Sequence, residues 1–175
     1  VAQNVLVQRG TLALHRRLGW VTAGLAVAMV PLGGFTAAMS IVRDRLPPFF
    51  QPDIFIALNL LELAAFTLLM SWAIRARRRT EWHKRLMLCA MIAIIGPAFG
   101  RILPMPLLGP WAGLAVMGAQ LLFVLPLIIH DLRRAGRIHP ASLIGGATIL
   151  IEGLAVPILA ATPLVAALAR ALSPA

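Results

Sequence analysis

Apolar residues along this chain fall into five long runs that are separated by short polar segments. The runs cover approximately residues 18–42, 54–74, 86–103, 111–130 and 143–165. A helix needs about 20 apolar residues to cross a hydrocarbon core about 30 Å thick, and each run is close to that length. The pattern therefore predicts an all-α integral membrane protein, with about five transmembrane helices that form a single domain over residues 1–175.

The polar segments between the runs are short. They cover residues 43–53, 75–85, 104–110 and 131–142. Short connections favour antiparallel neighbours in a compact bundle. Residues 1–17 mix polar and apolar positions, and we expect them to lie along the membrane interface. The first run is longer than the 7–15 apolar residues of a secretory signal, so we interpret it as a retained helix.

Basic residues are concentrated on one side of this predicted topology. Of the sixteen lysines and arginines, twelve lie in the N-terminal tail and in the second and fourth connections. Because cytoplasmic loops carry the excess of basic residues, the N-terminus is predicted to be cytoplasmic and the C-terminus outside, in a bacterial inner membrane. The bases in these two connections are expected to anchor the topology and contact anionic lipid headgroups. They are Arg75, Arg77, Arg78, Arg79, Lys84, Arg85, Arg133, Arg134 and Arg137.

Composition supports the membrane class and excludes several others. Hydrophobic residues make up 60% of the chain and charged residues 13%, whereas a globular domain is about 45–50% apolar. The net charge is +10. Because the basic residues lie in short loops between apolar runs, we do not expect a nucleic acid as partner. Cys89 is the single cysteine, which excludes an internal disulfide. The chain contains no nucleotide-binding loop, nucleophile triad or cysteine-rich metal motif, which argues against an enzyme of the hydrolase or kinase type.

Five polar side chains interrupt the apolar runs: Asn59, Glu62, Arg101, Gln120 and Glu152. Charges in hydrocarbon are costly and point by default to function. We expect Glu62 to pair with Arg101, with Asn59 one turn away, and Glu152 to bond Gln120 or a carbonyl at a helix kink. Two interpretations follow: a proton or ion route with Glu62 and Glu152 as carriers, or polar contacts that only fasten helices together.

Four of the runs contain a proline: Pro31, Pro97, Pro126 and Pro157. A proline in a helix has no N–H to donate to the carbonyl four residues earlier. In a membrane that carbonyl must find another partner. The carbonyls concerned are those of Val27, Ala93, Leu122 and Gly153, and Ala93 is the one freed by Pro97.

All four histidines fall on the predicted cytoplasmic side, next to the runs: His15, His83, His130 and His139. Imidazoles from two helices can ligate haem iron, and with carboxylates they can bind other metals. Neighbouring arginines and lysines instead suit a phosphate or lipid headgroup. A third interpretation is that these histidines only fasten loops.

Four segments resemble the signatures of a family of small, uncharacterised bacterial multi-pass membrane proteins. They are HRRLGW (15–20), EWHKRLMLCA (81–90), GPAFGR (96–101) and DLRRAGRIHPAS (131–142). The resemblance implies an α-helical membrane protein and ties His15, His83, Arg101 and His139 to the matching motifs. It implies no particular reaction.

Three functions remain open from the sequence. We expect an accessory or structural subunit of a larger bacterial membrane complex, of the respiratory or photosynthetic type, with lipids and other subunits as partners. The small size, the short loops and the absence of a catalytic constellation favour it. The alternatives are a redox protein that binds haem or a metal through the histidines, and a proton or ion transporter that uses Glu62 and Glu152.

Overall fold

The computed structural model describes residues 10–173, in which every regular element is a helix and no strand occurs. The helices are α2 (Leu12–Val42), α3 (Pro52–Arg75), α4 (Thr80–Ala93), α5 (Gly96–Ile102), α6 (Met105–Leu108), the short 3-10 turn η1 (Gly109–Trp111), α7 (Ala112–Ala135), α8 (Pro140–Ala160) and α9 (Pro163–Leu172).

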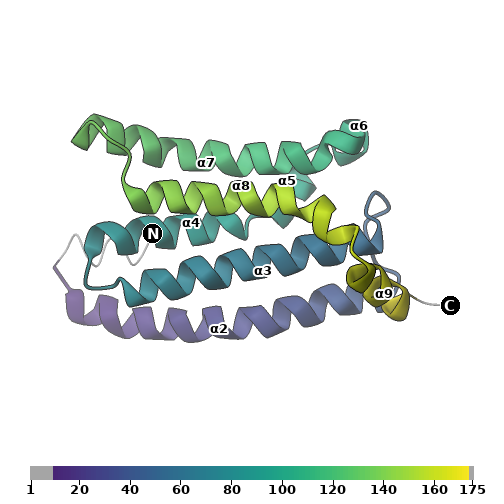
Figure 1. Ribbon diagram of the computed structural model, residues 1–175. Coiled ribbons are helices and arrows are strands. Elements are labelled where there is room, and N and C mark those ends of the chain that lie inside the picture. Colours follow the sequence, from purple (N-terminus) through teal and green to yellow (C-terminus); the bar gives the residue numbers. More distant parts are fainter. Residues whose placement is uncertain (1–9, 174–175) are drawn as a thin grey trace.

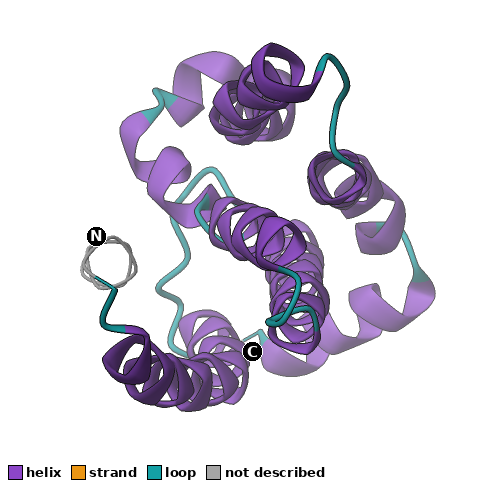
Figure 2. Cartoon of the chain, turned by 90° about the vertical axis from the view of Figure 1, so that its left-hand side faces the viewer, coloured by secondary structure: helices purple, strands orange, loops and turns teal. Residues whose placement is uncertain are grey.

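The long helices lie side by side and alternate in direction (Figure 1). The start of α2, the turn between α3 and α4 and the connection between α7 and α8 lie together at one end, called here the basic end. Viewed from that end, most helices appear nearly end-on (Figure 2). The second and fourth connections, which carry most of the basic residues, therefore meet at one end of the bundle, as the sequence predicted.

Four helices are long and apolar enough to cross a membrane, or five if the bent pair α4–α5 counts as one span. These helices suggest a multi-pass membrane protein, and they confirm the predicted helical bundle with four or five helices of membrane-spanning length. The α2 span and the α6–α7 span each have only 11% of their most apolar window buried within the chain, so both present wide apolar faces outward.

The third predicted span is not one straight helix. It begins at Thr80, before the predicted start, and breaks after Ala93, and its two parts are bent by 45°. Pro97, in the first turn of α5, has no N–H with which to continue the hydrogen bonding of α4. The break therefore lies where the proline frees a carbonyl.

The fifth predicted span, residues 143–165, is also corrected. Helix α8 ends at Ala160, and a separate helix, α9, begins at Pro163. Thr162 ends the first and caps the second: its Oγ1 donates to the Leu159 carbonyl at 2.7 Å and accepts from the Val165 N–H at 3.4 Å. The 21 residues of α8 already span about 30 Å. Helix α9 then packs Val165 and Ala169 against α2 and α3.

Helix α3 lies at the centre of the bundle and contacts α2, α4, α8 and α9. The core around it is apolar and includes Phe66, Leu69, Leu86 and Ile149, all 2% exposed or less. Its central position places any polar residue on the inner face of α3 against several other helices at once.

Candidate functional site

Three polar side chains are buried inside the bundle, and two of them lie beside the α4–α5 break. Glu62 on α3, Gln120 on α7 and Glu152 on α8 are 3%, 4% and 5% exposed. Glu62 and Gln120 both approach Gly96, the first residue of α5, and Glu62 and Glu152 are close enough to interact electrostatically. Three helices thus contribute one polar side chain each to what we call the carboxyl site: Glu62, Gln120 and Glu152.

The Gln120 amide satisfies the carbonyls at the helix break. Its Nε2 donates to the Ala93 carbonyl at 3.0 Å and to the Ile92 carbonyl at 3.2 Å. Ala93 carries the carbonyl that Pro97 leaves without its helical donor, so the expectation that this group finds another partner is confirmed. The amide nitrogen of Gln120 is therefore engaged with α4 rather than with Glu152.

The Glu62 carboxyl packs directly against the backbone of Gly96, which has no side chain. A Cβ atom built at Gly96 would overlap the Oε1 atom of Glu62 and would lie 3.2 Å from its Cδ atom. Only glycine allows the chain and this carboxyl to approach so closely. Glycine at the break therefore makes room for the Glu62 carboxyl in the core.

One oxygen of each carboxyl in the site is unpartnered. Oε1 of Glu62 and Oε2 of Glu152 are buried and accept no hydrogen bond in the described part of the chain. An ionised carboxylate buried without donors or a countercharge is strongly destabilising. The arrangement is chemically suited to hold a proton or a small cation at these oxygens.

The two other polar residues predicted for this region do not join the site. Arg101 is exposed, and its Nη1 donates to the Pro97 carbonyl of its own helix at 2.8 Å. Asn59 donates to the Phe55 carbonyl, also at 2.8 Å. The expected Glu62–Arg101 pair is therefore not formed, and Arg101 supplies no countercharge to the buried carboxyls.

A second polar cluster, at the basic end, was not predicted as a site. Arg85 on α4 and Asp131 on α7 are 5% and 2% exposed. Asp131 Oδ1 accepts from Arg85 Nε at 3.0 Å and from Nη2 at 2.5 Å. Asp131 Oδ2 accepts from the Ser142 hydroxyl at 2.5 Å and from the His139 N–H at 3.1 Å. Arg85 also pairs with Glu81 on its own helix.

This cluster corrects the role that the sequence suggested for Arg85, which was grouped with the lipid-facing bases. Its guanidinium points into the bundle and ties α4 to α7, while Ser142 ties α7 to α8. The signal in the sequence was Asp131, an acidic residue at the end of an apolar run next to a basic loop. Hydropathy alone did not show which base it meets.

The histidines separate into different environments at the basic end. His130 is exposed on α7. His139 caps α8, because its Nδ1 accepts from the Ala141 N–H at 3.1 Å, and its ring lies edge-on to Trp82 with centroids 5.4 Å apart. Burial and the nearby Arg85 charge lower the pKa of His139 below its usual value.

His15 and His83 line one cavity of about 750 Å³ with Trp20 and two arginines of the α3 end, Arg77 and Arg78. His83 Nδ1 lies 2.8 Å from the Ala73 carbonyl, so this nitrogen is the donor of that hydrogen bond. His15 Nδ1 is buried without a hydrogen-bond partner. Among residues 10–173, no group of three or more His, Cys, Asp and Glu side chains is placed to hold a metal ion.

The predicted lipid-facing bases other than Arg85 are at the surface. Arg75, Arg78 and Arg79 border a groove along α3, and Arg77 lies over the Trp20 ring, 5.9 Å from its centroid. The others are Lys84, Arg133, Arg134 and Arg137, all exposed. Lys84 is paired with Glu81 on its own helix, and none of the other bases forms an ion pair in the described part of the chain.

No protein-family model, curated protein or solved structure matches this chain. The resemblance to small bacterial multi-pass membrane proteins therefore stays a prediction. The class that the fold defines is a helical protein with several helices of membrane-spanning length.

Proposed function

We propose that this chain is a multi-pass protein of a bacterial inner membrane that binds a proton or a small cation at Glu62 and Glu152 and transports it. The observation that carries the proposal is the pair of buried carboxyl oxygens without a hydrogen-bond partner, on two helices that span the bundle. Ionisable groups inside a membrane are costly, and ion pathways and proton relays are among the functions that they mark.

The broken third span supports the same function. In many transporters the coupling ion binds near the middle of the membrane, beside helices that are interrupted there. Here the break between α4 and α5 adjoins Glu62 and Gln120. A discontinuous helix is also a place where a small rotation of one segment can open or close access to buried groups.

The proposed orientation places the basic end in the cytoplasm, because basic residues favour that side. The carboxyl site then lies between the two membrane faces, away from the basic end. Access from each side in turn is what transport would require, and the bend at α4–α5 is the element most suited to control it.

The test is proton flux into liposomes that contain the purified protein, followed with a pH-sensitive dye under an imposed potential. We expect flux that Glu62→Gln and Glu152→Gln each abolish, because the amide cannot release a proton. Asp44→Asn is the matched control. It also removes one carboxylate, but from an exposed loop position where φ is 49°, a conformation that asparagine tolerates.

Two further readouts make the result interpretable. Infrared difference spectra between acid and neutral pH should contain a protonated-carboxyl band that both glutamine variants reduce. Flux of labelled Na⁺ in place of protons would identify the cation. Equal flux and equal infrared spectra in the wild type, Glu62→Gln and Glu152→Gln would overturn the proposal.

The accessory-subunit function remains a second candidate, favoured by the wide apolar faces of α2 and α7. Residues such as Phe35 and Leu122, 65% and 66% exposed, would contact either lipid or neighbouring subunits. Photo-crosslinkers at these two positions in the native membrane distinguish the two cases. Stoichiometric adducts with another polypeptide support a subunit role, and adducts with lipid alone contradict it.

A redox function is a third candidate, limited now to His15 and His83, which share one cavity. Haem bound there would use the Nε2 lone pair of His83, oriented by its bond to the Ala73 carbonyl in the way that outer hydrogen bonds orient metal-bound histidines. An absorption spectrum of protein purified from its native membrane checks this. A Soret band lost in His83→Ala but kept in His130→Ala would support it.

A further inference from the structure

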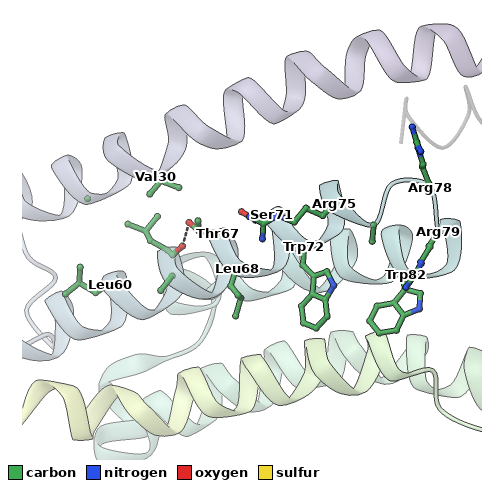
Figure 3. Close-up of a pocket in the computed structure, with 14 residues that line it drawn as sticks. Val30, Leu60, Thr67, Leu68, Ser71, Trp72, Arg75, Arg78, Arg79 and Trp82 are labelled. Carbon is green, nitrogen blue, oxygen red and sulfur yellow. Dashed lines mark hydrogen bonds between the residues drawn. The ribbon is translucent and has the colours of Figure 1, made fainter.

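A long groove follows one face of α3 toward the basic end (Figure 3). It has a volume of about 1210 Å³, and Val30 and Gly34 of α2 form part of its wall. The α3 residues that line it recur every three or four positions, which places them on a single helical face. They are Leu60, Leu63, Ala64, Thr67, Leu68, Ser71, Trp72 and Arg75, and Ala76, Arg78 and Arg79 of the following turn and Trp82 of α4 continue the wall.

The groove is apolar along most of its length. The hydroxyl of Thr67 is already used within α3, where it donates to the Leu63 carbonyl at 2.6 Å. Leu60, Leu68 and Trp72 contribute hydrocarbon and ring surface. Such a wall suits an alkyl chain and offers little to a polar ligand.

The length of this apolar part matches one leaflet of a bilayer. From Leu60 to Trp72 the helix rises about 18 Å at 1.5 Å per residue, and half of a hydrocarbon core is about 15 Å thick. Trp72 and Trp82 stack at the end of this stretch with ring centroids 5.9 Å apart, and tryptophans concentrate at the membrane–water boundary.

The end of the groove beyond the tryptophans is strongly basic. Arg75, Arg78 and Arg79 all line it and are exposed. None of the three forms an ion pair in the described part of the chain, where the salt bridges involve only Lys84 and Arg85 among the bases. Arg75 is the last residue of α3, and Arg78 and Arg79 lie in the turn that follows it. Guanidinium groups without an ion pair suit a phosphate group.

We propose that this groove is a binding site for one anionic phospholipid of the leaflet at the basic end. One acyl chain lies along α3 from Trp72 to Leu60, and the headgroup phosphate sits among Arg75, Arg78 and Arg79. The site is separate from Glu62, which points into the core, so it holds whether or not the chain transports ions.

The test measures lipid binding to the purified full chain in detergent, by native mass spectrometry and by the shift of its melting temperature. Phosphatidylglycerol should bind and stabilise the protein, and phosphatidylcholine should do so much less. Replacing Arg75, Arg78 and Arg79 together by glutamine should weaken phosphatidylglycerol binding by about 100-fold, since each basic residue near a charged surface contributes about a factor of five.

The matched control replaces Arg133, Arg134 and Arg137 by glutamine. This variant loses the same three charges at the same end of the bundle, but outside the groove, and should keep the selective binding. A second variant, Ala64→Leu, fills the apolar part of the groove and leaves all charges in place. Ala64 is exposed, so the fold should tolerate the change, while the preference for a full acyl chain should fall.

Three outcomes would overturn the proposal. The first is equal binding of the anionic and zwitterionic lipids. The second is an equal loss in the groove triple variant and the control triple variant, which would indicate charge attraction without a site. The third is that glycerol phosphate alone stabilises the protein as much as the lipid, which would assign the arginines to a free anion.

Discussion

The guanidinium of Arg85 and the carboxylate of Asp131 form an ion pair in the interior of the bundle, between residues 46 positions apart in the sequence. Asp131 Oδ1 lies 2.5 Å from Nη2 and 3.0 Å from Nε of Arg85. Both Asp131 oxygens are occupied, because Ser142 and His139 donate to the other one. The pair therefore joins α4, α7 and the start of α8 at the basic end.

Removing one partner of this pair should be costly. We expect Asp131→Ala to lower the free energy of unfolding by about 3 kcal/mol, because it leaves the buried Arg85 guanidinium with only the exposed Glu81 carboxylate as countercharge. Thermal or denaturant unfolding in detergent, followed by circular dichroism, measures this. The double variant Arg85→Met, Asp131→Leu should lose less stability than Asp131→Ala, since it removes both buried charges of the pair. An Asp131→Ala protein as stable as the wild type would contradict a structural role for the pair.

Gly96→Ala should disturb the carboxyl site directly. The added methyl group would overlap Oε1 of Glu62, and overpacking of this kind costs about 1–3 kcal/mol. Gly100→Ala is a matched control one turn later on α5, where a Cβ would meet nothing within 4 Å. We expect Gly96→Ala to reduce both stability and any proton flux, with Gly100→Ala close to wild type. Similar effects of the two changes would show that the space at Gly96 is not needed.

Gln120→Leu should destabilise the helix break. The change keeps the side chain large but leaves the Ala93 carbonyl without the donor that now reaches it. The Ile92 carbonyl keeps the Ile95 N–H as a donor. An unsatisfied buried polar group costs about 1–3 kcal/mol. Asn59→Leu is the comparison, because Asn59 donates only to the Phe55 carbonyl within a continuous helix. Unfolding measurements in one detergent should give Gln120→Leu a clearly lower free energy of unfolding than Asn59→Leu.

Stability should depend on pH through His139. Its pKa is lowered in the folded protein by burial and by Arg85, so the unfolded chain binds the proton more readily. Its contribution is therefore fully present above the unfolded value of about 6.5 and is lost as the pH falls below it. Protonation would also remove the Nδ1 acceptor that caps α8.

The measurement is the melting temperature of the wild type and of His139→Asn between neutral and mildly acidic pH. Asparagine is a good helix cap that does not titrate in this range, so the variant should melt normally at neutral pH and show a smaller loss in acid. His130→Asn, at an exposed position, should keep the wild-type pH dependence. Identical acid profiles for the wild type and His139→Asn would exclude His139 as the group responsible.

The hydropathy pattern by itself determined the class of fold, the approximate spans and the gathering of basic connections at one end. These features are local, because spanning a bilayer requires a certain length of apolar helix whatever its neighbours are. The pattern also identified Glu62, Gln120 and Glu152 as unusual, since polar groups inside apolar runs are costly wherever they face. Pro97 located the freed Ala93 carbonyl before its partner was known.

Only the tertiary structure decided how the helices are rotated about their axes, and with that the partner of each polar group. Arg101 lies at the surface and Glu62 in the core. Gln120 donates to the carbonyls at the helix break. Arg85 is buried against Asp131 and does not face the lipid headgroups. The tertiary structure also ends α8 at Ala160 and folds α9 back onto α2 and α3. The physical reason is that apolar residues surround these helices on nearly every side, so composition does not distinguish the inward face from the outward one. The packing of neighbouring helices makes that distinction.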